Sequence, residues 1–123
     1  MKLRKITPIL RSFDESKAKE FYLEFLEFNL DWEHRSEEDL PLYMQISKEN
    51  CALHISEHHG DCSPGAAIRI ETDDLEQYHQ RLLGKKYQYA RPAIQDMPWG
   101  GKDMVISDPF GNRIIFTGAI NER

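Results

Sequence analysis

Long hydrophobic runs are missing from this chain of 123 residues. The longer stretches without a charged side chain, such as residues 40–47, are far shorter than the about 20 apolar residues that a helix needs to cross a bilayer. The first residues are charged and are soon followed by Thr7, Pro8 and Arg11, so they contain no apolar core of a signal peptide. We therefore predict a cytoplasmic protein that does not enter a membrane.

Clusters of cysteine or of basic residues are absent as well. Cys51 and Cys62 are the only cysteines and form no Cys-x-x-Cys pair. The sequence thus predicts reduced thiols rather than a zinc site, although one bridge between them would be chemically feasible. The 16 Lys and Arg residues are outnumbered by 21 Asp and Glu, for a net charge of -5, and are scattered along the chain. Nucleic-acid binders gather basic residues on one surface, so we expect no nucleic-acid partner.

What remains is the composition of a globular domain. Hydrophobic residues make up 40% and aromatic residues 11% of the chain, which is enough to fill a core without a metal or a disulfide. At this length we expect one domain that spans residues 1–123.

The first half predicts a strand, a helix and three further strands. Asp14 is a suitable N-cap, and the apolar residues after it recur at helical spacing. These residues are Ala18, Phe21, Tyr22, Phe25 and Leu26. The strands are predicted at residues 5–10, 29–35, 42–47 and 51–56, with charged or turn-forming segments between them.

The second half repeats this order after a loop rich in His, Gly and Pro. Asp73 or Asp74 caps a helix that ends at Gly84 and carries Leu75, Tyr78, Leu82 and Leu83 on one face. Strands are predicted at residues 66–71, 87–91, 102–107 and 113–118, with a Pro- and Gly-containing turn at residues 108–112. The halves, residues 5–56 and 66–118, lie about sixty residues apart, which indicates an internal duplication.

The repeat and two short motifs resemble a known superfamily. The helix opens with Asp14-x-x-x-Ala18-x-x-Phe21-Tyr22, and Asp108-Pro109-Phe110-Gly111-Asn112 precedes the last strand. This pattern resembles the vicinal-oxygen-chelate superfamily of glyoxalases, ring-cleaving dioxygenases, fosfomycin-resistance enzymes and bleomycin-resistance proteins. The resemblance implies an α+β fold in which two tandem βαβββ modules form a curled, cup-shaped mixed sheet with helices on its outer face. Pro8, Asp31-Trp32 and Pro98-Trp99-Gly100 resemble the bleomycin-resistance branch.

The resemblance also says where a metal would bind. Metal-using members place His or Glu ligands on the first strand of each module and a Glu on the last strand. The matching residues here are Thr7, Gly65 (Ala66 if the register shifts by one) and Ile115, with Ile114 beside it. None of them offers an imidazole or a carboxylate. The resemblance therefore implies a protein without a metal or other cofactor at these positions.

A separate group of potential ligands follows the fourth strand. His54, His58, His59 and Asp61 lie close together in the sequence. His58 and His59 are neighbours whose side chains point apart, with no helical spacing to hold both on one ion. Two interpretations stay open: displaced ligands of a metal-dependent lyase, or a polar loop beside a strand histidine that faces a groove.

Alternation along the strands separates an apolar face from a polar one. Leu42, Met44 and Ile46 oppose Tyr43, Gln45 and Ser47, and Leu53 and Ile55 oppose His54. In residues 66–71 the apolar Ile68 and Ile70 oppose Arg69. We predict that Tyr43, Gln45, His54 and Arg69 line a ligand groove. The alternative is the solvated face of an open sheet.

Two tryptophans complete the predicted site. Trp99 lies in a loop between Pro and two Gly residues, where a large aromatic side chain either packs on its own fold or meets a ligand or partner. Trp32 follows Asp31, which pairs an aromatic wall with a negative charge. A cationic, planar ligand would suit this pair.

These observations favour a metal-free binder of small molecules. It resembles bleomycin-resistance proteins, which sequester a cationic aromatic antibiotic in grooves at a homodimer interface. No nucleophile elbow or phosphate loop is present, and Cys51 and His54 face opposite sides of their strand, so we predict no catalytic residue. The alternatives are a glyoxalase-like lyase or isomerase with displaced metal ligands, and an interaction module that has lost its ligand.

Overall fold

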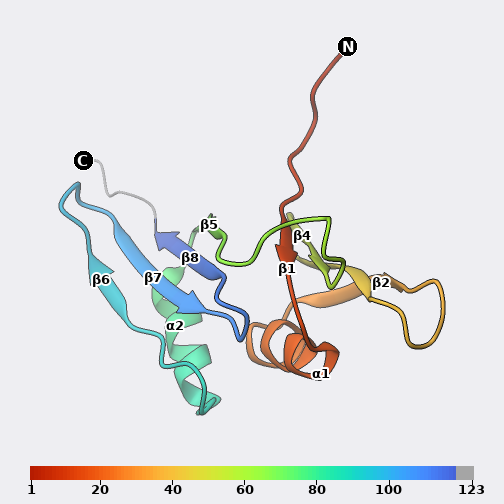
Figure 1. The fold of residues 1–123 in the computed structure, drawn as a ribbon. Helices are drawn as coiled ribbons and strands as arrows, with labels where there is room; N and C mark the ends of the chain where they lie inside the picture. The colour runs from red at the N-terminus through yellow and green to blue at the C-terminus, as the bar shows by residue number, and fades with distance from the viewer. Residues whose placement is uncertain (119–123) are drawn as a thin grey trace. The chain divides into compact units, whose positions relative to one another are not determined.

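The structure, a computed structural model, describes residues 1–118 and divides into two compact units, Met1–Pro64 and Gly65–Arg123. Each unit carries its own four-stranded mixed sheet. The predicted α+β class and the two βαβββ modules are confirmed. In chain order the elements are β1 (Ile9–Arg11), α1 (Glu15–Lys19), the π-helical segment η1 (Glu20–Phe25), β2 (Asn29–His34), β3 (Tyr43–Lys48), β4 (Cys51–Ser56), β5 (Ala67–Thr72), α2 (Leu75–Gly84), β6 (Ile94–Asp96), β7 (Lys102–Ser107) and β8 (Arg113–Gly118) (Figure 1).

The sheet of the first unit has the strand order β1-β4-β3-β2. β1 runs parallel to β4, whereas the pairs β3/β4 and β2/β3 are antiparallel. The predicted alternation is confirmed, because Met44, Ile46, Leu53 and Ile55 are buried while Tyr43, Gln45 and His54 on the opposite face are only half-buried. One face therefore belongs to the core, and the other, called the open face below, is partly exposed.

The helical region of this unit begins at Asp14, as predicted. The carboxylate of Asp14 accepts a hydrogen bond from the backbone N–H of Lys17 at 2.9 Å. α1 continues into η1, where the N–H of Leu26 bonds to the carbonyl of Phe21 five residues earlier. All five apolar positions predicted from helical spacing are buried, and the ring of Phe21 meets that of Tyr22 edge-on at 4.8 Å. This region supplies three buried aromatic residues, Phe21, Tyr22 and Phe25, to the core of the first unit.

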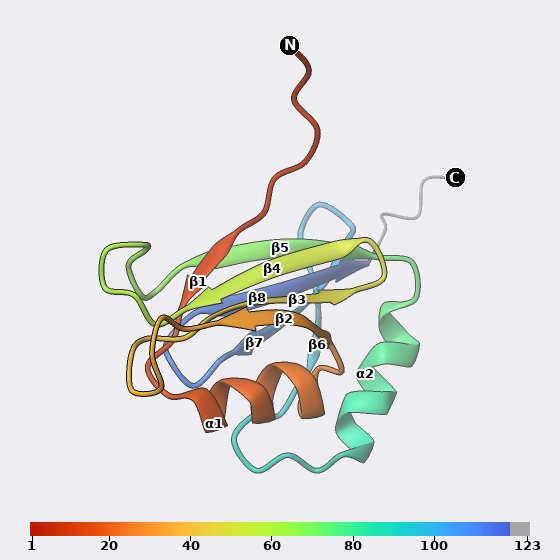
Figure 2. The same cartoon turned by 90° about the vertical axis from the view of Figure 1, so that its right-hand side faces the viewer.

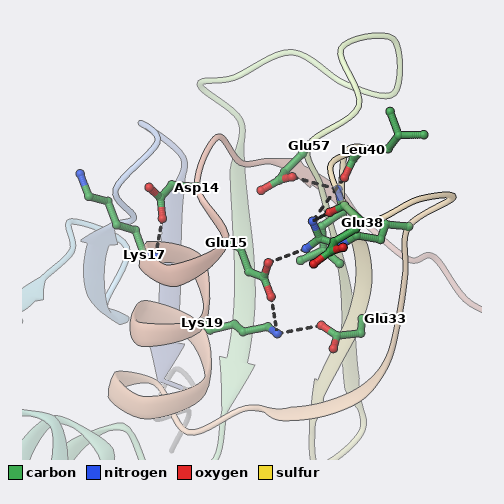
Figure 3. Close-up of polar contacts among 10 residues, drawn as sticks. Asp14, Glu15, Lys17, Lys19, Glu33, Glu38, Leu40 and Glu57 are labelled. Atoms are coloured by element: carbon green, nitrogen blue, oxygen red, sulfur yellow. Dashed lines mark hydrogen bonds and ion pairs between the residues drawn. The ribbon is translucent and has the colours of Figure 1, made fainter.

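A chain of ion pairs on the surface joins α1 to β2 (Figure 3). Lys19 lies 2.8 Å from both Glu15 and Glu33, and Arg35 pairs with Glu15. The guanidinium of Arg35 also donates to the carbonyls of Glu38 and Leu40 at 3.1 and 3.3 Å. The network thus holds the β2–β3 connection close to the start of the helix.

Replacing Glu15 by Gln should lower the free energy of unfolding by less than about 1 kcal/mol, because the pairs are solvent-exposed. Hydrogen bonding to Lys19, then its charge and Arg35, keeps the pKa of Glu15 below its ordinary value despite partial burial. A depressed pKa stabilises the fold at neutral pH and loses this contribution as pH falls through the folded-state pKa. Urea denaturation should therefore separate wild type from Glu15→Gln at about pH 7 and show no difference at about pH 2.5. An equal difference at both values would contradict the role of the charge.

The second unit has the strand order β5-β8-β7-β6, with β5 parallel to β8. α2 is capped by Asp74, which accepts from the N–H of Gln77 at 3.2 Å. Leu75 and Leu82 are buried, and Tyr78 meets Phe116 of β8 edge-on at 5.1 Å. α2 therefore packs on the face of this sheet that carries Phe116. Both helical regions within residues 1–118 are too short and too polar to cross a bilayer.

Two details of the prediction for the second unit are wrong. Residues 87–91 form a turn rather than a strand, and β6 begins at Ile94. Lys86 adopts a left-handed φ of 52° and Pro92 offers no N–H to a ladder, so the chain joins the sheet only after Pro92. Leu83 is exposed rather than on the buried face of α2.

The first strand also starts later than predicted, at Ile9 rather than at residue 5. Met1, Leu3 and Ile6 are almost fully exposed, and the chain before β1 extends away from the sheet of its unit (Figures 1 and 2). Pairing with β4 begins only at Pro8, whose carbonyl accepts from the N–H of His54 at 2.9 Å.

Candidate functional site

Three aromatic side chains meet on the open face of the first sheet. Trp32 of β2 and Tyr43 of β3 are nearly parallel, with an interplanar angle of 9° and ring centroids 6.0 Å apart. The imidazole of His54 on β4 stands edge-on to both rings, at 5.4 Å from Trp32 and 5.1 Å from Tyr43. Trp32 is 45% exposed, so part of this aromatic cluster remains accessible to a ligand.

A β-bulge brings Asp31 to the same face. The register of β2 against β3 shifts between Leu30 and Trp32, which leaves Asp31 outside the pairing. In a regular strand Asp31 and Trp32 would point to opposite faces. Here the carboxylate of Asp31 instead accepts hydrogen bonds from Gln45 at 3.0 Å and from Ser47 at 2.9 Å, both on the open face of β3.

Four hydrogen bonds join these residues into one chain, and its direction is fixed. A carboxylate only accepts, so Gln45 must turn its NH2 group to Asp31 and its carbonyl oxygen to His54. The Nε2 atom of His54, 2.9 Å from that oxygen, must therefore carry a hydrogen. In the neutral imidazole the Nδ1 atom is then the acceptor, and the hydroxyl of Tyr43 donates to it at 2.6 Å.

The surroundings keep both ends of the His54–Tyr43 pair neutral. Burial, followed by the charge of Lys5, lowers the pKa of His54 below its ordinary value. Burial, followed by the charges of Asp61 and Cys62, raises the pKa of Tyr43. The hydroxyl of Tyr43 donates its only hydrogen to His54. Its oxygen can therefore act only as an acceptor towards a ligand. The polar atoms of this hydrogen-bond chain that remain available to a ligand are thus mainly acceptors.

Arg69 and Trp99 belong to the second unit. The Nη2 atom of Arg69 donates to both carboxylate oxygens of Asp103, at 2.9 and 3.1 Å, and the side chain of Asp103 is only 4% exposed. The charge of Arg69 is therefore offset by a buried partner. Trp99 lies in the β6–β7 loop with 54% of its surface exposed, where Gly100 supplies a left-handed φ of 97°.

Comparison with known proteins places the whole chain in one family. Residues 1–123 match the sequence model of a family described as glyoxalase superfamily protein. The chain belongs to the glyoxalase superfamily. No curated protein matches its sequence.

Solved structures of superfamily members share the fold. A bleomycin-binding protein in complex with bleomycin has a TM-score of 0.75 and 23% identity, over 98% of this chain and 100% of its own. The antibiotic-binding protein TnmS3 from Streptomyces sp. CB03234 has a TM-score of 0.73 and 23% identity, over 96% and 98%. A bleomycin resistance determinant encoded on transposon Tn5 has a TM-score of 0.73 and 20% identity, over 94% and 98%. At such identities the likeness shows the fold alone.

The residues at the metal positions that the resemblance implies do not fit a metal ion. Thr7, Gly65 and Ile115 lack suitable donors, as noted from the sequence. Both nitrogens of His54, the imidazole on β4, are already hydrogen-bonded, to Tyr43 and to Gln45.

The structure also gives no support for a metal bound at other positions, by His58 and His59 after β4. His58 and His59 lie in the loop after β4, where His58 is held through its backbone by Ser56 and Arg11. Within the part of the chain that the structure describes, no three His, Cys, Asp or Glu side chains are grouped to hold a metal ion. We therefore assign no reaction step to a metal.

The structure thus brings together Asp31, Trp32, Tyr43, Gln45 and His54, all predicted as site residues. Two residues that form hydrogen bonds with these predicted site residues or with Arg69 were not predicted from the sequence. Ser47 shares the open face of β3 with Tyr43 and Gln45, so the alternation pattern could have identified it. Asp103 could not be identified in this way, because its pairing with Arg69 reaches across β8 from β7 to β5.

Proposed function

We propose that this protein binds a cationic, aromatic small molecule on the open face of its first sheet and sequesters it without chemical change. The aromatic cluster of Trp32, Tyr43 and His54, beside the carboxylate of Asp31, carries the proposal. Trp and Tyr faces attract cations, and a carboxylate adds a localised negative charge. We also propose Arg69 and Trp99, both in the second unit, as ligand-binding residues.

Charge supports a cation as the ligand. The chain has a net charge of -5, which favours the approach of a positive molecule. Arg69 would repel such a ligand if its charge were free, but Asp103 binds it with two short hydrogen bonds. The pair is close to neutral as a unit, so Arg69 does not oppose the proposal.

The neighbours suggest the chemical class to test first. Two of them are described as bleomycin-binding and antibiotic-binding proteins. A bleomycin-type glycopeptide combines planar rings with positive charge, so it matches the aromatic cluster and Asp31.

We also propose a homodimer, as in the binders that the sequence resembles. Light scattering that shows only monomer at micromolar concentration would contradict the homodimer.

A thermal-shift titration of metal-stripped protein tests the function. A ligand that binds only the folded state must raise the melting temperature. We expect a bleomycin-type glycopeptide to raise it, and Ni²⁺, Zn²⁺ or Mn²⁺ alone to leave it unchanged. A shift with a metal ion alone would instead support a metal-dependent lyase and direct attention to His54, His58 and His59.

Replacing Trp99 by Ala should weaken glycopeptide binding about 5- to 10-fold, because a stacking aromatic residue contributes about 1 kcal/mol or more. Isothermal titration calorimetry measures the loss directly. Tyr89→Ala is the matched control, since Tyr89 is another aromatic residue in a loop of the second unit and is 70% exposed. Equal affinities for Trp99→Ala and wild type, with an intact fold, would remove Trp99 from the site.

A further inference from the structure

The direction of the hydrogen-bond chain decides what the site offers to a ligand. Every donor in the chain points from Tyr43 towards Asp31: the phenol to His54, His54 to Gln45, and Gln45 to Asp31. Ser47 closes the chain by donating to the other oxygen of Asp31. With neutral His54 the phenol oxygen and the carboxylate present lone pairs beside the aromatic faces, which suits ammonium or N–H groups.

We propose that His54 determines the class of ligand: in its neutral form it selects cations and hydrogen-bond donors, and its protonation expels them. This inference rests on the proposed function, because it concerns the same face of the first sheet. Binding of a cation and binding of a proton therefore oppose each other at this site. Uptake of the ligand is then favoured at neutral pH and release is favoured in acid.

Protonation changes two properties of the site at once. The Nδ1 atom gains a hydrogen, so the hydroxyl of Tyr43, 2.6 Å away, must become the acceptor and turn its own hydrogen away from His54. The phenol then offers a donor where a cationic ligand needs an acceptor. The imidazolium also places a positive charge 5.4 Å from the ring of Trp32, where the cation would stack.

Charged and titratable groups act on His54 from several elements. Lys5 acts on it from the segment before β1, and Asp31 acts from β2 through Gln45. Tyr43 contacts it directly from β3 and is itself influenced by Asp61 and Cys62. The ring of His58 lies 6.4 Å from that of Tyr43. Among these groups, His54 alone contacts both Trp32 and Tyr43 and belongs to the hydrogen-bond chain.

A permanently charged probe separates protonation of the protein from that of the ligand. We choose N-methylquinolinium, a flat aromatic cation, and 2-naphthalenemethanol as a neutral aromatic of similar size. Calorimetry on the full chain should show binding of the cation about 10-fold weaker at about pH 5 than at about pH 8, because a new charge at this distance changes affinity by about that factor. Binding of the neutral probe should change much less.

Variants identify the responsible group. His54→Gln keeps one donor for Gln45 and one acceptor for Tyr43, so it should fold; its affinity for the cation should fall with the lost ring, and the ratio of its affinities at the two pH values should drop to about 1. His59→Gln is the matched control, because His59 is exposed in the following loop, and it should keep the pH dependence. By linkage, saturating N-methylquinolinium should lower the pKa of His54, followed by proton NMR of its imidazole, by about one unit.

The outcomes separate this inference from the function on which it rests. Equal affinity for the cation at both pH values would overturn the role of His54 and leave the proposed function standing. The same holds if His54→Gln retains the full pH dependence. Failure of the cation to bind at either pH would overturn both the inference and the proposed function.

Discussion

Asn112→Ala should lower the free energy of unfolding by about 3 kcal/mol, because a buried amide loses two hydrogen bonds at once. Asn112 is fully buried in the turn before β8. Its carbonyl oxygen accepts from the N–H of Ala66 at 3.1 Å, and its NH2 group donates to Asp108 at 2.8 Å. Alanine would leave the N–H of Ala66 without this acceptor and take one donor from the carboxylate of Asp108. Urea denaturation with a fixed m-value gives the loss directly.

Gln80→Ala is the control for this substitution. It removes an amide from the exposed face of α2 and should change stability by less than about 0.5 kcal/mol. The side chain of Asn112 connects the turn before β8 to Ala66, the residue before β5. Because β5 runs parallel to β8, losing this connection should weaken the pairing of the two strands. If the two variants unfold at the same denaturant concentration, the turn does not connect these strands energetically.

Most of the fold could be predicted because local signals and burial agree. Asp14 and Asp74 cap the helices, and β4, β7 and β8 occupy the predicted residues. β6 could not be placed in the same way. Its three residues contain little strand signal of their own, and its position is set by pairing with β7, where Ile94 lies opposite Met104. Tyr87 and Tyr89 look strand-forming but contact each other in a turn.

The site was predictable only in its residue types. Alternation places Tyr43, Gln45 and His54 on one face, and the structure brings them together. Alternation also places Asp31 and Trp32 on opposite faces, and only the bulge at Asp31 reverses this. A bulge depends on how two strands pair, which no window of β2 alone reveals. The direction of the hydrogen-bond chain likewise needs all of its members in place.

The double variant Asp31→Asn, Trp32→Ala should weaken binding of a bleomycin-type glycopeptide about 40-fold, by calorimetry at neutral pH. As single variants, loss of the indole face and loss of the charge should each cost about 1.4 kcal/mol, or about 10-fold, and coupling between them makes the double loss smaller than the sum. Asn at position 31 keeps one acceptor oxygen for the NH2 group of Gln45, and its own NH2 group can donate to the hydroxyl of Ser47, which can accept, so its effect reports charge rather than collapse of the hydrogen-bond chain. Asp39→Asn removes the same charge from an exposed loop. An equal loss with Asp39→Asn would mean that net charge alone attracts the ligand.

The two single variants add a second test of the bulge. Side chains that act on one positive group are coupled, whereas side chains that touch separate parts of a ligand give additive losses. The bulge places the Asp31 carboxylate beside the residues that contact Trp32, so one cation can interact with both. We therefore expect a loss for the double variant that departs from the sum of the single losses by at least about 0.5 kcal/mol. Strict additivity would mean that the carboxylate and the indole bind different parts of the ligand, and that the bulge does not create a shared cation site.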